Sequence, residues 1–187
     1  IRLVQYFDGE SCFIFDVKEI GGLSWIQPLL ATQTIAHNAL FEAQHFLEQG
    51  IIFDDLHDTM LMGRVFYNEG KSLSSLAQDA LGLELDKILQ TSDWGRPELL
   101  PEQIEYAAAD AVVALKLAEI FEEWFTDNEP HYGEAYTLLQ RLIYPIARQL
   151  SHGVPFDIEN HRRIVEQWGQ EQAEARALIT DIDNPRS

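Results

Sequence analysis

The sequence is poor in cysteine and in long apolar runs. Cys12 is the only cysteine among 187 residues, so an internal disulfide is excluded, and a reducing, cytoplasmic compartment is the expected location. No apolar run has membrane-spanning length and no basic-then-apolar leader is visible, so neither membrane insertion nor secretion is predicted. Apolar residues make up 46% and charged residues 24%, which is typical of a globular protein.

Positive charge is also scarce. Thirteen Lys and Arg residues against 31 Asp and Glu residues give a formal net charge of −18. Affinity for phosphates comes mostly from Lys and Arg, so the chain is expected to bind nucleic acid poorly by non-specific attraction. If the substrate is a polyanion, the local positive charge must come from elsewhere. Divalent cations at clustered carboxylates would supply it.

Strand and helix patterns predict an α/β domain followed by a helical extension. The Asp-Gly pair at 8–9 predicts a tight hairpin between the first two strands. The predicted strands are 1–7, 12–17, 34–37 and 51–55. The predicted helices are a short one ending near 30, 39–49 with Asn38 as its cap, 58–67, 72–81, 101–125, 134–151 and 158–181, with a loop at 92–101 and a linker at 126–133.

A tyrosine and an aspartate stand four positions apart in the alanine-rich stretch QIEYAAADAVVAL, residues 103–115. Alanine has the highest helix propensity and neither Gly nor Pro interrupts the run, so it predicts a helix. Residues i and i+4 share one helical face, which places Tyr106 and Asp110 side by side. The spacing alone leaves two interpretations open: a surface hydrogen bond, or half of a catalytic site.

Glu42 is a second carboxylate of interest, because it lies on another predicted helix just after a strand. Converging carboxylates hold Mg²⁺ or Mn²⁺, which prefer oxygen ligands. Two such ions clamp the attacking and leaving oxygens of an in-line phosphoryl displacement. The phenol of Tyr106, whose ordinary pKa is about 10, would orient the attacking water without adding negative charge.

Several sequence segments, in this order, carry a family resemblance: HNALFE at 37–42, DTM at 58–60, SLSSLAQDALGLELDK at 72–87 and SDWGRPELLPEQIEYAAAD at 92–110. They resemble the 3′–5′ exonuclease domain shared by family A DNA polymerases and the ribonuclease D group. This is the DEDD superfamily with tyrosine in its third motif. The resemblance covers about residues 1–128. It implies an α/β fold with a ribonuclease H-like mixed sheet flanked by helices.

The C-terminal part adds to the resemblance. LLQRLIYPIARQLSHGVPFDIENHRRI at 138–164 resembles the helical stretch that joins exonuclease to polymerase in family A enzymes. Residues 129–187 are therefore expected to form a helical linker that resembles the start of a polymerase domain.

Two motifs depart from the family pattern. The second motif, Asn-x-x-(Phe/Tyr)-Asp, falls on Asn38, Phe41 and Glu42, so Glu replaces Asp and the carboxylate stands one methylene further out. The first motif, Asp-x-Glu on a central first strand, is expected upstream of Ile1. The segment Asp8-Gly9-Glu10 matches that motif literally, but it lies where a hairpin turn is predicted, and we reject it.

The resemblance implies metal-dependent hydrolysis of the 3′-terminal phosphodiester of single-stranded or frayed DNA, with release of 5′-mononucleotides, as the proofreading part of a DNA polymerase. Asp110 and Glu42 would hold two divalent cations, Mg²⁺ or Mn²⁺, and Tyr106 would position the water. Asn38 and Phe41 would lie beside the DNA 3′ end. Two alternatives stay open: an inactive scaffold that braces a polymerase or holds DNA, and RNA 3′-end trimming in the ribonuclease D manner.

Other residues in these segments have structural interpretations. Asp58 is expected to cap the helix that follows it. His37 is expected to be positioned by the turn before a helix rather than to bind metal. Asp93 and Trp94 are expected to anchor the loop at 92–101 by hydrogen bonding and packing.

Overall fold

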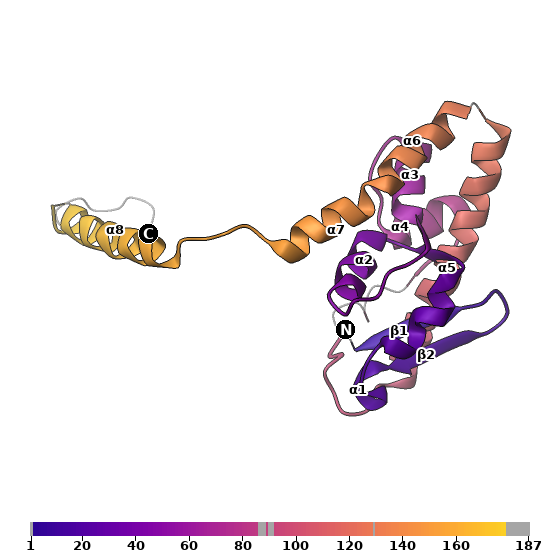
Figure 1. Cartoon of the computed structure of the whole chain (residues 1–187), viewed down its shortest axis with the longest axis horizontal. Coiled ribbons are helices and arrows are strands. Elements are labelled where there is room, and N and C mark those ends of the chain that lie inside the picture. Colours follow the sequence, from indigo (N-terminus) through magenta and orange to yellow (C-terminus); the bar gives the residue numbers. More distant parts are fainter. Residues whose placement is uncertain (1, 86–88, 90–91, 129, 179–187) are drawn as a thin grey trace. The chain divides into compact units, whose positions relative to one another are not determined.

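The computed structural model describes residues 2–85, 89, 92–128 and 130–178. The chain divides into two compact units, Ile1–His152 and Gly153–Ser187, which are described separately. The first unit combines both sheets with most of the helices (Figure 1). It therefore includes helices beyond residue 128, which pack with the α/β part.

The N-terminal hairpin is confirmed. Strands β1 (Leu3–Phe7) and β2 (Cys12–Asp16) pair antiparallel, from Leu3 opposite Asp16 to Phe7 opposite Cys12. In the connecting turn, Asp8 Oδ1 accepts the backbone N–H groups of Glu10 at 2.9 Å and Ser11 at 2.7 Å. The Asp8-Gly9-Glu10 segment is therefore an exposed turn and not part of a strand.

Strands β3 (Gln33–Ala36) and β4 (Asp55–Asp58) form a second, parallel pair. The predicted strand at 51–55 was wrong, because regular pairing begins only at Asp55. Side chains hold the preceding backbone instead: the Tyr144 hydroxyl accepts the Phe53 N–H at 2.6 Å and donates to the Phe53 carbonyl at 3.3 Å. In the described part of the chain, β1 pairs only with β2, and β3 only with β4.

Helices make up most of the remaining structure. In chain order they are α1 (Val17–Ile20), the 3₁₀-helix η1 (Ser24–Ala31), α2 (Ala39–Leu47), α3 (Thr59–Tyr67), α4 (Leu73–Leu76), the π-helical turn η2 (Ala77–Leu81), α5 (Pro101–Asp127), α6 (Pro130–Arg141), α7 (Ile143–His152) and α8 (Ile158–Leu178). Most of them match the predicted helices, but α1 was not predicted, and the single helix predicted at 134–151 is divided into α6 and α7. The predicted helix end at 181 lies outside the described residues.

The predicted linker at 126–133 was wrong. Helix α5 continues to Asp127, and α6 begins at Pro130. Aromatic pairs explain the tight connection: the rings of Trp124 and Tyr132 lie 4.8 Å apart, and those of Phe125 and Tyr136 lie 5.6 Å apart. These contacts fold α6 back against the end of α5.

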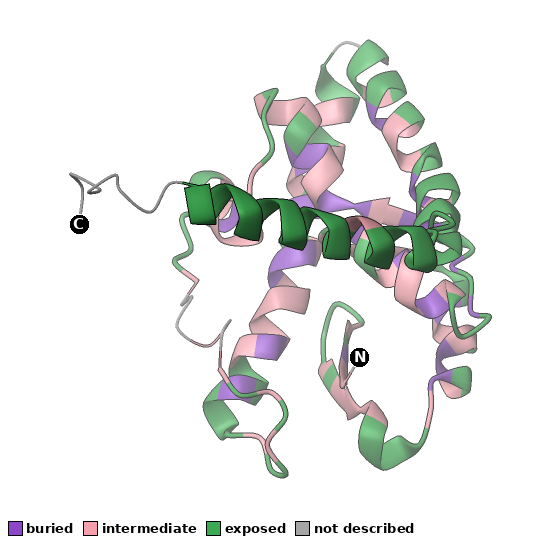
Figure 2. Cartoon of the chain, turned by 90° about the vertical axis from the view of Figure 1, so that its left-hand side faces the viewer, coloured by how far each residue is buried: buried purple, intermediate pink, exposed green. Residues whose placement is uncertain are grey.

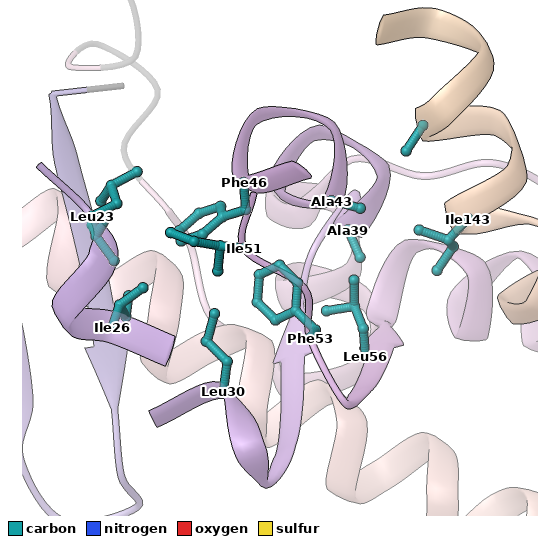
Figure 3. Close-up of a cluster of buried hydrophobic side chains, with 12 residues drawn as sticks. Leu23, Ile26, Leu30, Ala39, Ala43, Phe46, Ile51, Phe53, Leu56 and Ile143 are labelled. Atoms are coloured by element: carbon teal, nitrogen blue, oxygen red, sulfur yellow. The ribbon is translucent and has the colours of Figure 1, made fainter. Parts of the chain in front are cut away.

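Two apolar clusters hold the first unit together. One lies between η1, α2, the segment before β4 and α7, with ten of its residues labelled in Figure 3; it includes Ile26, Phe46, Phe53 and Ile143. The other joins α3, α4, η2 and α5 through buried residues that include Met62, Leu76, Leu117 and Phe121. The first cluster fixes α2 and the second fixes α5, so each helix carrying a predicted site residue rests on its own core.

The second unit contains α8. This helix has no buried residue and is exposed along nearly its whole length (Figure 2). Its start is marked by Asp157, whose Oδ1 accepts the Asn160 backbone N–H at 2.9 Å. In the described part of the chain, no helix combines the length and apolarity needed to cross a membrane.

Candidate functional site

A cavity of about 930 Å³ in the first unit is lined by residues of β1, β3, α2 and α5. All five site residues predicted from the sequence line it: Asn38, Phe41, Glu42, Tyr106 and Asp110. The carboxylates from two different helices thus border one space. This shared lining is the structural relationship that the metal hypothesis requires, and it leaves the role of each residue a prediction.

Tyr106 and Asp110 reach the cavity from α5, one helical turn apart. The Tyr106 ring lies 6.2 Å from the ring of Trp94, measured between centroids, and the two planes make an angle of 46°. Burial raises the pKa of Asp110 to about 6. Near pH 6 this carboxyl is therefore partly protonated. A bound cation would stabilise its ionised form.

Glu42 reaches the cavity from the first turn of α2. Its Oε2 atom is buried without a hydrogen-bond partner in the described part of the chain. Burial, and to a lesser degree the negative charge of Asp58, raises the pKa of Glu42 to about 7. A buried carboxylate oxygen that lacks a donor is costly unless a cation or a proton satisfies it.

The start of α2 is built differently from the prediction. Asn38 does not cap the helix with its side chain; its backbone is in the left-handed region, with φ 64° and ψ 49°. Asp58, from the end of β4, replaces that cap: its carboxylate accepts the N–H groups of Asn38 and Ala39, each at 3.0 Å. The same carboxylate accepts the Met60 N–H at 2.8 Å, so the predicted cap at Asp58 is confirmed.

Phe41 forms an aromatic surface at the cavity. Its side chain is 50% exposed, although it is large and apolar. The ring of His45 lies 4.1 Å from it, and His45 Nδ1 donates to the Phe41 carbonyl at 2.8 Å. An exposed ring held in place by a neighbouring ring is suited to stack on a flat ligand.

His37 also lines the cavity, and sequence reasoning had given it no more than a structural role. The Thr59 hydroxyl donates to the Ala36 carbonyl at 3.3 Å, so it accepts from His37 Nδ1 at 3.0 Å. This bond fixes the neutral tautomer with the proton on Nδ1. Burial lowers the pKa of His37 to about 4, so the ring stays uncharged near neutral pH.

The described residues do not provide a complete ligand set for a metal. Among the residues that the structure describes, no group of three or more His, Cys, Asp or Glu side chains is placed to hold a metal ion. Three described carboxylate residues line the cavity: Glu42, Asp110 and Asp8 of the exposed hairpin turn.

Comparisons with known proteins agree with one another. A family model described as 3′–5′ exonuclease matches residues 1–124. DNA polymerase I of Aquifex aeolicus is 32% identical over 135 residues, which are 72% of this chain and 24% of that protein. Ribonuclease D of Haemophilus influenzae is 29% identical over an alignment that covers 95% of this chain and 49% of that protein.

Solved structures show the same fold. Escherichia coli RNase D, described as an exoribonuclease involved in structured RNA processing, matches with a TM-score of 0.62 at 25% identity, over 76% of this chain and 40% of that one. Brucella melitensis NrnC with bound Mg²⁺ matches with a TM-score of 0.67 at 18% identity, over 83% and 79% of the two chains. These matches confirm the predicted α/β, ribonuclease H-like fold. The chain spans half or less of the two curated relatives' lengths.

Proposed function

Because this chain belongs to the 3′–5′ exonuclease family, whose model matches residues 1–124, we propose that it removes the 3′-terminal nucleotide of single-stranded or frayed DNA. Water attacks the terminal phosphorus, the bond to the O3′ of the preceding nucleotide breaks, and a 5′-mononucleotide leaves. The O3′ of the shortened strand takes up a proton. The observation that carries this proposal is the single cavity lined by Glu42, Tyr106 and Asp110.

The residues at the cavity fit a divalent metal. Glu42 and Asp110 offer carboxylate oxygens, the ligands that Mg²⁺ and Mn²⁺ prefer. Glu42 Oε2 has no hydrogen-bond partner among the described residues, and burial raises the pKa of both carboxyls. Both features indicate that the ionised carboxylates need a compensating positive charge. We assign two ions to the site. When bound, they lower the pKa of water and neutralise charge on the phosphoryl oxygens.

We infer where further metal ligands would lie. Both β1 and β3 line the cavity, and each has an unpaired edge in the described part of the chain. A strand inserted between them would pair both edges. Unpaired edges would otherwise be free to associate with other chains. The expected Asp-x-Glu segment would occupy this position and bring two carboxylates to Glu42 and Asp110.

The remaining residues orient the substrate and the water. Tyr106 Oη holds the attacking water in line with the bond to be broken. The backbone near Asn38 and the exposed ring of Phe41 receive the terminal nucleotide, with the ring stacked on its base. Because the chain is strongly acidic, these contacts and the metals, rather than a basic surface, would hold the strand.

A second candidate is the trimming of RNA 3′ ends. It is favoured by the ribonuclease D relative, which aligns with 95% of this chain, whereas the DNA polymerase I relative aligns with 72%. A third is an inactive scaffold, favoured by the longer Glu42 side chain and by the lack, among the described residues, of a group of three side chains placed to hold a metal ion. Within the DNA hypothesis, the domain would proofread for a polymerase module, because a mispaired 3′ end frays more readily.

The test is cleavage of 5′-labelled single strands by the natural protein. DNA and RNA of one sequence are compared with Mg²⁺, with Mn²⁺ and with a chelator. Metal-dependent, stepwise shortening of DNA supports the proposal; preference for RNA supports the second candidate, and no cleavage supports the scaffold. Asp110→Ala should abolish cleavage, while Glu119→Ala, at an exposed position of the same helix, should not.

A further inference from the structure

Arg2 binds the loop before α5 through a fully used guanidinium group. Its Nε and Nη2 donate to Asp16 Oδ2 at 3.1 and 3.0 Å. Nη1 donates to the carbonyls of Trp94, at 2.7 Å, and Arg96, and Nη2 donates to that of Pro97 at 3.1 Å. All five N–H donors of the side chain therefore have acceptors. The three carbonyls belong to residues more than ninety positions away along the chain.

Gln103 binds the same loop from the other side. It is 1% exposed and lies one turn before Tyr106 on α5. Its Nε2 donates to Ser92 Oγ at 2.9 Å and to the Asp93 carbonyl at 3.2 Å, and its Oε1 accepts the Leu100 N–H at 2.9 Å. Both amide hydrogens are used. A substitution at this buried position would leave loop groups without partners.

Trp94 lies between these two anchors. Gln103 binds the carbonyl of Asp93, the residue just before Trp94. Arg2 binds the carbonyl of Trp94 itself and those of two of the three residues that follow it. The ring of Trp94 lies next to the ring of Tyr106. Because the loop backbone is fixed on both sides, the place of the Trp94 ring is fixed too, and with it one wall of the space that the phenol occupies.

We propose that Arg2 and Gln103 are positioning residues that act through Trp94 to hold the Tyr106 phenol at the cavity. This inference rests on the proposed exonuclease function. Neither residue touches substrate or metal; each sets the orientation of the group that orients the water. A displaced phenol leaves the carboxylates unchanged, so loss of either anchor lowers kcat and leaves metal binding and KM in place. Misplacement by about 1 Å can cost on the order of a hundredfold in rate.

The experiment is a double-mutant cycle between Arg2 and Tyr106 in the natural protein. Arg2→Lys keeps the charge beside Asp16 but lacks the planar fork that reaches three carbonyls. We expect kcat to fall about tenfold in the otherwise unchanged protein. In a Tyr106→Phe background, which has no hydroxyl to place, the same change should alter kcat by less than about twofold. An equal fall in both backgrounds would overturn the proposal.

Control variants separate positioning from general damage. Arg64→Lys makes the same chemical change on an exposed arginine of α3 and should leave kcat unchanged. Trp94→Leu tests the same relay without touching either anchor and should show the same loss of effect in the Tyr106→Phe background. If Arg2→Lys does not fold, the Trp94 cycle decides, and equal falls in its two backgrounds overturn the proposal.

A readout without activity distinguishes this inference from the proposed function. Protein labelled with 3-fluorotyrosine gives a ¹⁹F resonance for each tyrosine, and Tyr106→Phe identifies the relevant one. Arg2→Lys should shift or broaden the Tyr106 resonance, and Arg64→Lys should not. An unchanged Tyr106 resonance contradicts the positioning role. A protein that cleaves nothing but shows this shift would contradict the proposed function alone.

Discussion

The carboxylate of Asp58 accepts the backbone N–H of Asn38 at 3.0 Å and so holds a left-handed residue at the start of α2. An L-residue in that region is strained unless its surroundings fix it. The next N–H, of Ala39, is bound by the other oxygen of the same carboxylate. Asp58 thereby sets the path of the chain from β3 into α2, on which Glu42 and Phe41 reach the cavity.

Asp58→Asn should destabilise the fold by about 2–4 kcal/mol. The carboxylate accepts three N–H groups at a position that is 1% exposed, whereas an amide presents an NH₂ group to at least one of those donors. The measurement is the free energy of unfolding in urea. Asp54→Asn, on an exposed aspartate before β4, is the matched control and should change it by less than about 0.5 kcal/mol. Equal effects of the two changes would refute this role for Asp58.

Without metal, the contribution of Glu42 to stability should fall as pH rises from about 4.5 to about 7, while that of His37, whose pKa is lowered to about 4, should rise over part of the same range. Folded Glu42 keeps its proton up to about pH 7, whereas its ordinary pKa is 4.5. At Glu42 the folded state therefore binds more protons in this window, and the contribution of this residue to the free energy of unfolding falls as pH rises, by up to about 3 kcal/mol. Asp110, with its pKa raised to about 6, adds a smaller fall of the same sign.

Glu42→Gln tests this pH dependence. In the presence of a chelator, the free energy of unfolding of the variant should rise with pH relative to that of the unchanged protein between pH 4.5 and 7, and Glu48→Gln, at an exposed position after α2, should leave the pH dependence unchanged. Bound Mg²⁺ or Mn²⁺ requires both carboxyls ionised, so metal affinity should rise over the same window. A metal affinity independent of pH from 5 to 8 would exclude these two carboxyls as ligands.

Tyr106→Phe should slow cleavage by about 10²-fold without weakening metal binding. The change removes one hydroxyl and keeps the ring against Trp94, so the cavity keeps its shape. The measurements are kcat on a labelled single strand and Mn²⁺ affinity by titration. Tyr132→Phe, on a partly exposed ring of α6, is the control. Unchanged kinetics in Tyr106→Phe would remove the phenol from the mechanism.

The sequence predicted the elements whose signals are local. The Asp-Gly turn, the uninterrupted helix through Tyr106 and the cap at Asp58 follow from neighbouring residues, and the structure contains all three. That Glu42 and Asp110 border one cavity came from a family resemblance, because nothing in their spacing brings two helices together.

Features that depend on distant contacts could not be predicted in this way. The apolar residues at 51–53 are typical of a strand. Instead of strand pairing, the Phe53 backbone is hydrogen-bonded by Tyr144, ninety-one positions after Phe53. Asn38 is a favoured capping residue, yet Asp58 takes that role from another strand. Arg2 carries no local signal at all, since its three acceptor carbonyls are defined only once the loop before α5 has folded next to Arg2.

Gly63→Ala should destabilise the first unit by about 1–2 kcal/mol, against the usual gain from placing alanine in a helix. A Cβ at Gly63 would lie 2.9 Å from both δ-methyl groups of Leu76, which is fully buried. The close approach of α3 to α4 therefore depends on the missing side chain. Gly133→Ala in α6 meets nothing within 4 Å and should instead stabilise by up to about 1 kcal/mol. Urea unfolding of both variants gives the comparison, and in a Leu76→Ala background Gly63→Ala should become stabilising, because the two methyl groups that it strikes are gone.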